Sequence, residues 1–437
     1  MSGCLIRSFD RTTQCRSRIY EITDNTSLHH IEEKSIIARG SGLSYCNASA
    51  IENGLSIDVR KLDKILFFDE ERGFITVQSG ITIGALNNFL IQNRWQIPVM
   101  PGYPFITVGG CIAFNVHGKS QTNVGLFIDW IEELVLYHPQ KGEIICSKHV
   151  NEDVFNLTVG GFGLTGIIVE AKLKLKKIEG NSMEIKTIRT LNLRECVKII
   201  QQEELNFEYI YSWNNFNSKA TSFGKGIVYL ENIKKGFSEK NKPISYRNRL
   251  EFRPHLPSLL NRQTVPLMCL AYYQLNKFSH ATNIKSLYHS SFPIYGKEIY
   301  FHLFGNSGFR EYQVLFDFNE WEAAVSKIEQ CIRDKKIAVS LASLKIFRGK
   351  THNISFSGNG ICLAIDVPND KKGISFFNAL DEISIAHNGL VNLSKDSRAS
   401  HELISKTYSD YHNFKKAIND YDPSRLFSSD LRNRLNI

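Results

Sequence analysis

PGYPFITVGGCIAFNVHGK, residues 101–119, is the stretch that decides the fold. Within it, Gly109 and Gly110 follow the β-branched Val108 and precede small and apolar residues. Glycine has no Cβ, so a flat ring system and a diphosphate can lie directly on the main chain at such a pair. The alternative is that these glycines serve only turns. The long, unusual spacing favours a ligand-binding segment.

Two further glycine-rich turns occur in the same half of the chain. RGSGLSY, residues 39–45, follows a predicted apolar strand, and GGFGLTGIIV, residues 160–169, leads into another. Each turn alone is explained as well by loop structure. The first is not a Rossmann fingerprint, because it lacks the third glycine and no helical pattern follows it. Three such turns together, without a P-loop, predict an extended cofactor that contains phosphate.

The segments around these turns predict an α+β domain. Short β-rich runs alternate with glycines from Ser35 to about Leu175. We expect a hairpin that turns at residues 70–73. We also expect a helix over residues 83–93, because apolar residues recur there at helical spacing after Thr82, a suitable N-cap.

The sequence changes in character near residues 176–184, and 437 residues are enough for two cores. We assign residues 1–178 to the cofactor domain and 179–400 to a substrate-binding, or cap, domain with an antiparallel sheet flanked by helices. Residues 401–437 are predicted to be helical and to return to the first domain. Predicted strands of the cap domain are GIVYLE, MCLAYYQL, REYQVLFDF, SLASLKIF and ICLAIDVP, and a predicted helix is NEWEAAVSKIEQCIRDKK.

Composition excludes several classes of protein. Hydrophobic residues make up 42% of the chain and charged residues 22%, as in globular proteins. The net charge of +9 is spread along the chain without a nucleic-acid-binding module, so we expect no nucleic-acid partner. The nine cysteines lack metal-ligand spacing and are interpreted as reduced packing thiols, with no metal. Without a signal peptide or a long apolar run, the expected location is the cytoplasm, with peripheral membrane contact left open.

The ordered set RGSGLSY, PGYPFITVGGCIAFNVHGK and GGFGLTGIIVEAKL resembles the FAD-binding domain of the vanillyl-alcohol oxidase and p-cresol methylhydroxylase superfamily. Within it, the chain is most similar to the oxidases of polyprenylphosphoryl-ribose, with EYQ, SLASLKIF, AIDVP, SKDSR and DPSRLFSSDLRNRL matching later parts in order. The cap region between residues 180 and 310 matches less clearly. The resemblance implies a two-domain α+β flavoprotein with a p-cresol-methylhydroxylase-type FAD-binding domain and an antiparallel-sheet cap domain.

The resemblance also implies where FAD is held. Many superfamily members attach the flavin to a histidine at the position of Leu43, so FAD is expected to be non-covalent here. The residues expected to bind it are Arg39, Gly40, Ser41, Gly42, Leu43, Ser44, Tyr45, Pro101, Gly102, Thr107, Val108, Gly109, Gly110, Cys111, Ala113, His117, Gly118, Gly163, Thr165, Gly166 and Ile168.

On the substrate side, the resemblance points to three catalytic residues, Lys395, His117 and Tyr312. A lysine beside the flavin can hold the substrate hydroxyl or stabilise the alkoxide. The alternative for Lys395 is a surface ammonium paired with Asp396. Substrate-binding residues are expected to be Lys119, Gln313, Asp366 and Lys395.

Two pocket positions depart from the family pattern, because Ala364 stands at a cysteine position and Asn392 at a tyrosine position. The exact sugar and its lipid carrier are therefore left open, while FAD-dependent oxidation of a sugar hydroxyl is expected. In the family, polyprenylphosphoryl-ribose becomes a 2′-keto sugar that a separate NAD(P)-dependent short-chain reductase reduces. The net result is an epimerisation that serves cell-wall polysaccharide synthesis. The rivals are an alditol or sugar-lactone oxidase and a non-catalytic flavin-binding protein.

Overall fold

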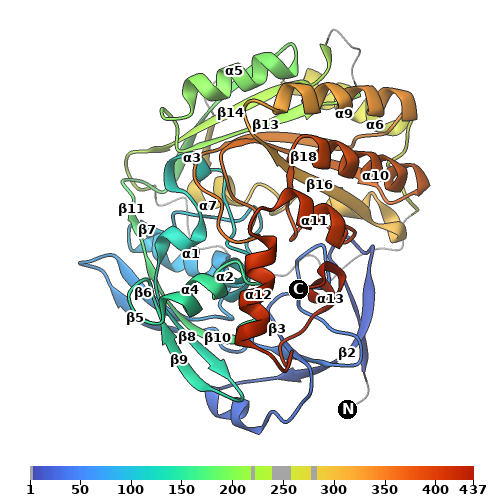
Figure 1. The fold of residues 1–437 in the computed structure, drawn as a ribbon. Helices are drawn as coiled ribbons and strands as arrows, with labels where there is room; N and C mark the ends of the chain where they lie inside the picture. The colour runs from blue at the N-terminus through green and yellow to red at the C-terminus, as the bar shows by residue number, and fades with distance from the viewer. Residues whose placement is uncertain (1–2, 218–221, 239–256, 277–282) are drawn as a thin grey trace.

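The computed structural model describes residues 3–217, 222–238, 257–276 and 283–437. A first sheet near the N-terminus has the order β1-β2-β4-β3, with β1 antiparallel to β2 and the other pairs parallel (Figure 1). Its strands are β1 (Cys4–Arg7), β2 (Gln14–Glu21), β3 (Ile36–Arg39) and β4 (Leu55–Asp58). The first glycine-rich turn therefore begins where β3 ends.

A second, wholly antiparallel sheet has the order β5-β6-β10-β8-β9. The predicted hairpin is confirmed, because Gly73 N donates to Asp69 O at 2.9 Å between β5 and β6. The predicted helix is confirmed too, and Thr82 caps α1 by accepting a hydrogen bond from Ala85 N. The elements of this part are β5 (Ile65–Asp69), β6 (Phe74–Gln78), α1 (Ile83–Gln92), β7 (Trp95–Gln96), α2 (Val108–Ala113), α3 (Gln121–Val124), β8 (Ile131–His138), β9 (Gly142–Cys146), α4 (Glu152–Thr158), β10 (Ile167–Lys174) and β11 (Lys176–Lys177).

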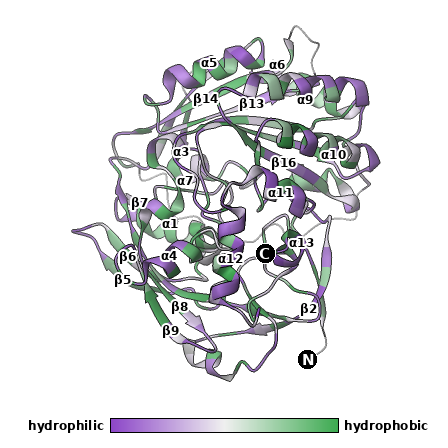
Figure 2. Cartoon of the chain, viewed as in Figure 1, coloured by the Kyte–Doolittle hydropathy of each residue, from purple (hydrophilic) through white to green (hydrophobic). Residues whose placement is uncertain are grey.

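The second half of the chain forms an eight-stranded antiparallel sheet in the order β15-β12-β14-β13-β17-β18-β16-β19. Helices α5, α9 and α10 lie over it at the top of Figure 1, and they carry hydrophobic and hydrophilic residues along their length (Figure 2). The predicted α+β class is thereby confirmed. The elements are β12 (Ser182–Thr190), α5 (Leu193–Glu203), β13 (Tyr209–Asn215), β14 (Lys225–Lys234), β15 (Asn283–Ser286), β16 (Phe309–Phe316), α9 (Trp321–Lys335), β17 (Leu341–Phe347), β18 (Gly360–Pro368), α10 (Lys371–Ala386) and β19 (Leu390–Val391).

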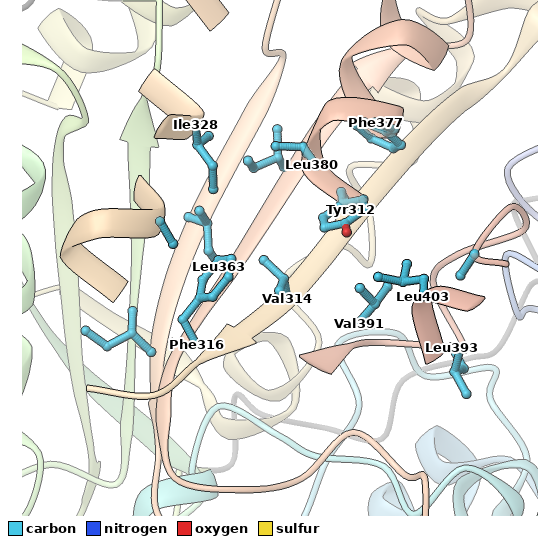
Figure 3. Close-up of a cluster of buried hydrophobic side chains, with 14 of the residues drawn as sticks. Tyr312, Val314, Phe316, Ile328, Leu363, Phe377, Leu380, Val391, Leu393 and Leu403 are labelled. Carbon is cyan, nitrogen blue, oxygen red and sulfur yellow. The ribbon is translucent and has the colours of Figure 1, made fainter. Parts of the chain in front are cut away.

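Strand alternation gives this sheet two chemically different faces. On the helix face, Val314 and Phe316 of β16 join Leu363 of β18 in a large apolar core (Figure 3). Glu311 and Gln313 alternate with those residues and point to the opposite face. That opposite face is the one available to form a site with the first domain.

One strand prediction is wrong. MCLAYYQL belongs to helix α6 (Thr264–Leu275). The next helices along the chain are α7 (Leu287–Ser291) and α8 (Ile299–His302). A continuous apolar run does not by itself distinguish a buried strand from a helix. Residues 239–256, part of the segment before α6, lie outside the described residues.

The C-terminal segment consists of α11 (His401–Thr407), α12 (Tyr411–Tyr421) and α13 (Asp430–Leu435). It returns to the first sheet, where Ile36 N donates to Leu426 O at 2.8 Å and Ser428 N donates to Ile36 O at 2.9 Å. The C-terminus is thus tied to β3, next to the first glycine-rich turn.

All nine cysteines lie in the described part and are free thiols, seven of them buried. Across the same residues no helix is both long and apolar enough to cross a bilayer. No group of three or more His, Cys, Asp or Glu in the described ranges has the arrangement of a metal site.

Candidate active site

The turn over residues 40–44 offers a row of backbone donors. Within the described residues, the N–H groups of this turn donate to no acceptor, although the turn is only half exposed. Gly42 has φ +64°, a left-handed conformation that glycine adopts without strain. Consecutive free N–H groups form an anion-binding concavity. This turn therefore has the donor set that a diphosphate needs.

The turn over residues 40–44 packs closely against the glycine-rich stretch 101–119, here called the central stretch. A Cβ on Gly40 would lie 2.2 Å from Thr107 Oγ1, so a side chain cannot fit there. Thr107 caps α2 by accepting from Gly110 N at 3.2 Å, and Gly109 N donates to Ser79 O at 2.8 Å. The structure thus brings the first two glycine motifs together, as a common ligand requires.

Several residues of the central stretch do not face a ligand. Val108 and Cys111 are fully buried, at 0% exposure, in the core of the first domain. Atoms that line a ligand site would be exposed in a structure without the ligand, so we correct their predicted role to support of the turn. Gly109, Gly110 and Ala113 are half exposed and accessible. Pro101 and Gly118 are buried, and Gly102 faces Ile294 of the second domain.

The third glycine-rich turn is used largely for packing. Gly160 N donates to Ile112 O at 2.9 Å and Phe162 N to Ala113 O at 2.8 Å, so this turn holds the end of α2. Thr165 has 0% exposure and its hydroxyl pairs with Thr158. Ile168 and Gly166 are buried as well. Burial of these three residues favours a structural role over the direct contact with FAD that was expected, while Gly163 remains half exposed.

Lys395 lies across the domain interface from the first turn. Its ammonium is 3.9 Å from the centre of the Tyr45 ring and 3.6 Å from Glu311 Oε2. Tyr45 N donates to Ser394 O at 2.8 Å, which fixes the two loops together. The alternative pairing of Lys395 with Asp396 is not formed, since Asp396 accepts from Arg398 N instead. The loop is built so that Lys395 points toward the glycine turn.

The His117 ring packs against the rings of Phe347 and Phe356, with centroids 4.8 and 5.4 Å away. Its Nε2 is 3.5 Å from Gln313 Nε2. Burial, and then the charges of Lys345 and Lys395, lower the pKa of His117 well below its ordinary 6.5. The imidazole is therefore neutral at pH 7 and able to accept a hydrogen bond or a proton.

Gln313 is held in place from both sides. Asn392 Nδ2 donates to its Oε1 at 2.6 Å, and its Nε2 donates to Cys362 Sγ at 3.4 Å. Asn392, the departure from the family pattern, thus orients Gln313. Ala364 is the direct β-ladder partner of Gln313, and its small side chain leaves space on this face.

Two carboxyl groups, those of Asp366 and Glu311, lie next to Gln313 and Ala364 on the same face of the eight-stranded sheet. Asp366 is opposite Glu311 in the β16–β18 ladder and accepts from Tyr300 OH at 2.9 Å. Burial, and then the negative charge of Glu311, raise the pKa of Asp366 well above its ordinary value. The protonated form of Asp366 is therefore favoured over its ordinary behaviour, while Glu311 is the partner of Lys395.

Two residues of this face escaped the sequence reasoning. Glu311 precedes the quoted Tyr312 and Gln313 and shares the strand face of Gln313. Lys345, in the predicted strand SLASLKIF, is close enough to His117 to lower its pKa. Burial also lowers the pKa of Lys345 itself. A lone lysine in an otherwise apolar strand was the signal that could have identified it.

Tyr312 was predicted to be catalytic, and the structure corrects this. Its side chain is on the helix face of the sheet, among core residues (Figure 3). Its hydroxyl lies 3.1 Å from Asp381 Oδ1 and 2.9 Å from Ser384 Oγ, both on α10. The period of two along β16 places it opposite to Gln313.

Lys119 also turns away from His117. Its ammonium donates to Ser290 O, lies 3.7 Å from Glu231 Oε2 and packs over the Tyr209 and Tyr211 rings. Burial lowers its pKa to about 8. The predicted role in binding substrate is therefore replaced by a buried ion pair that joins the domains. A separate cavity of about 240 Å³ lies nearby, lined by residues that include Gln96, Lys176 and Tyr209 but none of the glycine turns.

Comparison with known proteins agrees with this geometry. Residues 22–147 match the FAD binding domain family. The chain is 26% identical to decaprenylphosphoryl-beta-D-ribose oxidase of Mycolicibacterium smegmatis over 92% of its own length and 90% of that protein. It is 28% identical to D-lactate dehydrogenase of Anaerostipes hadrus over 36% of the chain and 34% of the relative. L-gulonolactone oxidase of Mus musculus is 24% identical over 39% of the chain and 40% of the relative.

The fold, the paired glycine turns and these matches define the class: the chain is an FAD-dependent oxidoreductase that acts on CH–OH groups. Within that class, residues 22–147 are similar to the FAD binding domain family. One relative that is similar to it over nearly its whole length is decaprenylphosphoryl-beta-D-ribose oxidase.

Proposed function

We propose that the chain binds FAD non-covalently and oxidises a secondary hydroxyl of a sugar, with polyprenylphosphoryl-ribose becoming its 2′-keto form. The observation that carries this proposal is the meeting of Lys395, Tyr45 and Glu311 at the domain interface, with His117 beside it. The similarity to decaprenylphosphoryl-beta-D-ribose oxidase extends over both domains and supports the same substrate class.

The residues present fit FAD. The free N–H groups of Gly40–Ser44 suit a diphosphate, and the half-exposed backbone at Gly109 and Gly110 admits a flat group. When bound, FAD supplies a two-electron acceptor for the hydride that leaves the carbinol carbon. Leu43 carries no nucleophilic atom, so it forms no covalent bond to a flavin, which supports non-covalent attachment.

Residues of the chain are placed to bind the substrate hydroxyl group and to accept its proton. The ammonium of Lys395 is placed to stabilise negative charge on the substrate oxygen as the carbon–hydrogen bond breaks. His117 is neutral, so its imidazole can accept the hydroxyl proton or a hydrogen bond from the hydroxyl group. Gln313, fixed by Asn392, orients the sugar.

The product is a ketone, and its reduction needs a separate hydride donor. We propose that a distinct NAD(P)-dependent short-chain reductase uses it, which gives a net epimerisation of the sugar in cell-wall polysaccharide synthesis. Similarity of the whole chain to an oxidase supports this division of labour.

The test is anaerobic addition of a water-soluble, short-chain prenylphosphoryl-ribose to the purified flavoprotein. We expect loss of the oxidised flavin absorbance and formation of a keto-sugar in equal amounts. Unchanged absorbance would contradict the proposed substrate. The second candidate is a soluble sugar lactone or alditol, which the partial match to L-gulonolactone oxidase supports. Bleaching by L-gulono-1,4-lactone alone would favour it.

A further inference from the structure

Helix α6, Thr264–Leu275, is apolar on both of its faces. TVPLMCLAYYQL contains no charged residue. Val265, Cys269 and Tyr273 recur at a spacing of four and are buried against the second domain. A helix that is apolar all round is normally enclosed by protein or lies in lipid. The outer face of α6 therefore needs an explanation.

That outer face is strongly exposed. Leu267 is 67%, Leu270 44% and Leu275 77% exposed. Leu267 and Leu270 lie three residues apart, on the side of the helix opposite Val265 and Cys269. Adjoining segments extend the apolar surface, because Leu259 and Ile299 are 48% and 61% exposed and Leu259 N donates to Leu303 O. Exposed apolar patches of this kind mark sites of association.

The exposed charged residues of the segment that contains α6 are basic. Acidic residues make up 44 of the 437 residues of the chain. In the described residues between 257 and 304, however, the single acidic residue is Glu298, which is buried at 5% exposure. Arg262 and Lys297 are exposed in the same region. Exposed leucines with basic residues and no exposed acid match the chemistry of an anionic membrane surface.

The inner side of α6 contacts the face of the sheet that carries the candidate site. The Tyr272 ring is 4.7 Å from that of Trp213 on β13, and its hydroxyl is 2.7 Å from Tyr229 OH on β14. Trp213 and Tyr229 lie on the face of the sheet that α5, α9 and α10 do not cover, and Lys345 lies on the same face. A surface that touches lipid through α6 would therefore hold the site side of the second domain near the bilayer.

We propose that the outer face of α6 docks the protein on an anionic bilayer. Leu267, Leu270 and Leu275 enter the headgroup region while Arg262 and Lys297 meet lipid phosphates. The purpose of docking rests on the proposed function, since a polyprenyl tail can then stay in the bilayer while its sugar reaches Lys395. The docking itself is independent of that function.

The test is co-sedimentation of the FAD-loaded full chain with vesicles of phosphatidylcholine alone or with 30% phosphatidylglycerol. We expect binding to the anionic vesicles that weakens with salt, and at least tenfold weaker binding of Leu267→Glu/Leu270→Glu. Leu205→Glu is the matched control, because Leu205 is 78% exposed on a different surface, beyond α5. This variant should bind the vesicles as the wild type does. An unchanged flavin spectrum shows that each variant is folded.

Failure of the wild type to bind anionic vesicles would overturn the proposal, as would binding by the double variant equal to that of wild type. A dimer in light scattering that the double variant abolishes, without vesicle binding, would assign this face to a second copy and also overturn it. Flavin bleaching by the water-soluble substrate is measured separately. If that substrate does not bleach the flavin, the proposed function fails, but the vesicle-binding result still tests the docking proposal.

Discussion

The ammonium of Lys395 lies 3.9 Å from the centre of the Tyr45 ring, although 350 positions separate the two residues in the chain. Tyr45 ends the first glycine-rich turn, and Lys395 is in the loop that precedes the C-terminal helices. The contact joins the cofactor side of the site to its substrate side.

Replacing Lys395 by methionine is expected to slow flavin reduction by about 10²–10³-fold, because a charge that stabilises the substrate oxygen is lost. FAD should remain bound. Stopped-flow absorbance under anaerobic conditions measures the rate. Lys406→Met is the control, since Lys406 pairs with Glu402 at the surface. A wild-type rate for Lys395→Met would exclude a catalytic role.

Tyr312→Phe is expected to leave the reduction rate unchanged and to lower the free energy of unfolding by about 1 kcal/mol, because the hydroxyl bonds only within the core. Urea denaturation gives the stability. Glu311→Gln, the neighbour on the other face, should instead slow reduction, as it removes the charge beside Lys395. The opposite pattern would show that Tyr312 faces the site.

Gly40→Ala is expected to abolish FAD binding while the protein folds, because the new Cβ would approach Thr107 Oγ1 to 2.2 Å and push the two turns apart. Flavin fluorescence during titration of the apoprotein measures the affinity. Gly3→Ala is the control, since its Cβ would find no atom closer than 3.9 Å. Tight FAD binding by Gly40→Ala would show that the two turns do not form one site.

The buried His117 predicts a pH dependence of stability. Its pKa in the folded protein is well below the ordinary 6.5, so below pH 6.5 the unfolded chain takes up a proton that the folded protein does not. Stability should therefore fall as the pH drops below about 6.5. We expect a shallower fall in His117→Gln, measured by urea unfolding from pH 5 to 8. Parallel curves would mean that folding does not shift the pKa of His117.

Lys119→Met is expected to destabilise the protein by about 3–5 kcal/mol, because Glu231 would be left charged and buried without its partner. Lys119→Met/Glu231→Gln should recover much of that loss. Thermal unfolding of the two variants provides the measurement. If Lys119→Met weakens substrate affinity without changing stability, the residue binds substrate after all.

Local patterns predicted much of the fold. The hairpin at residues 70–73 and the helix after Thr82 were correct because turn and capping signals act within a few residues. MCLAYYQL was assigned to the wrong element because α6 is apolar on both faces, which removes the periodicity that separates helix from strand.

The candidate site was predicted less completely. The glycine turns and Lys395 could be found because each carries a recognisable motif. Which of Glu311, Tyr312 and Gln313 face the site depends on the orientation of β16, which the packing of α10 decides. Likewise, the chain near Lys119 does not reveal that Glu231 lies beside it, since 112 positions separate them.

The visible spectrum before and after acid precipitation tests the central claim most directly. A protein that holds FAD non-covalently on the Gly40–Ser44 turn should be yellow when purified. Its colour should pass entirely into the supernatant when acid unfolds it. A colourless protein that takes up no added FAD would contradict the claim of a flavin site, and colour that stays with the pellet would contradict non-covalent attachment.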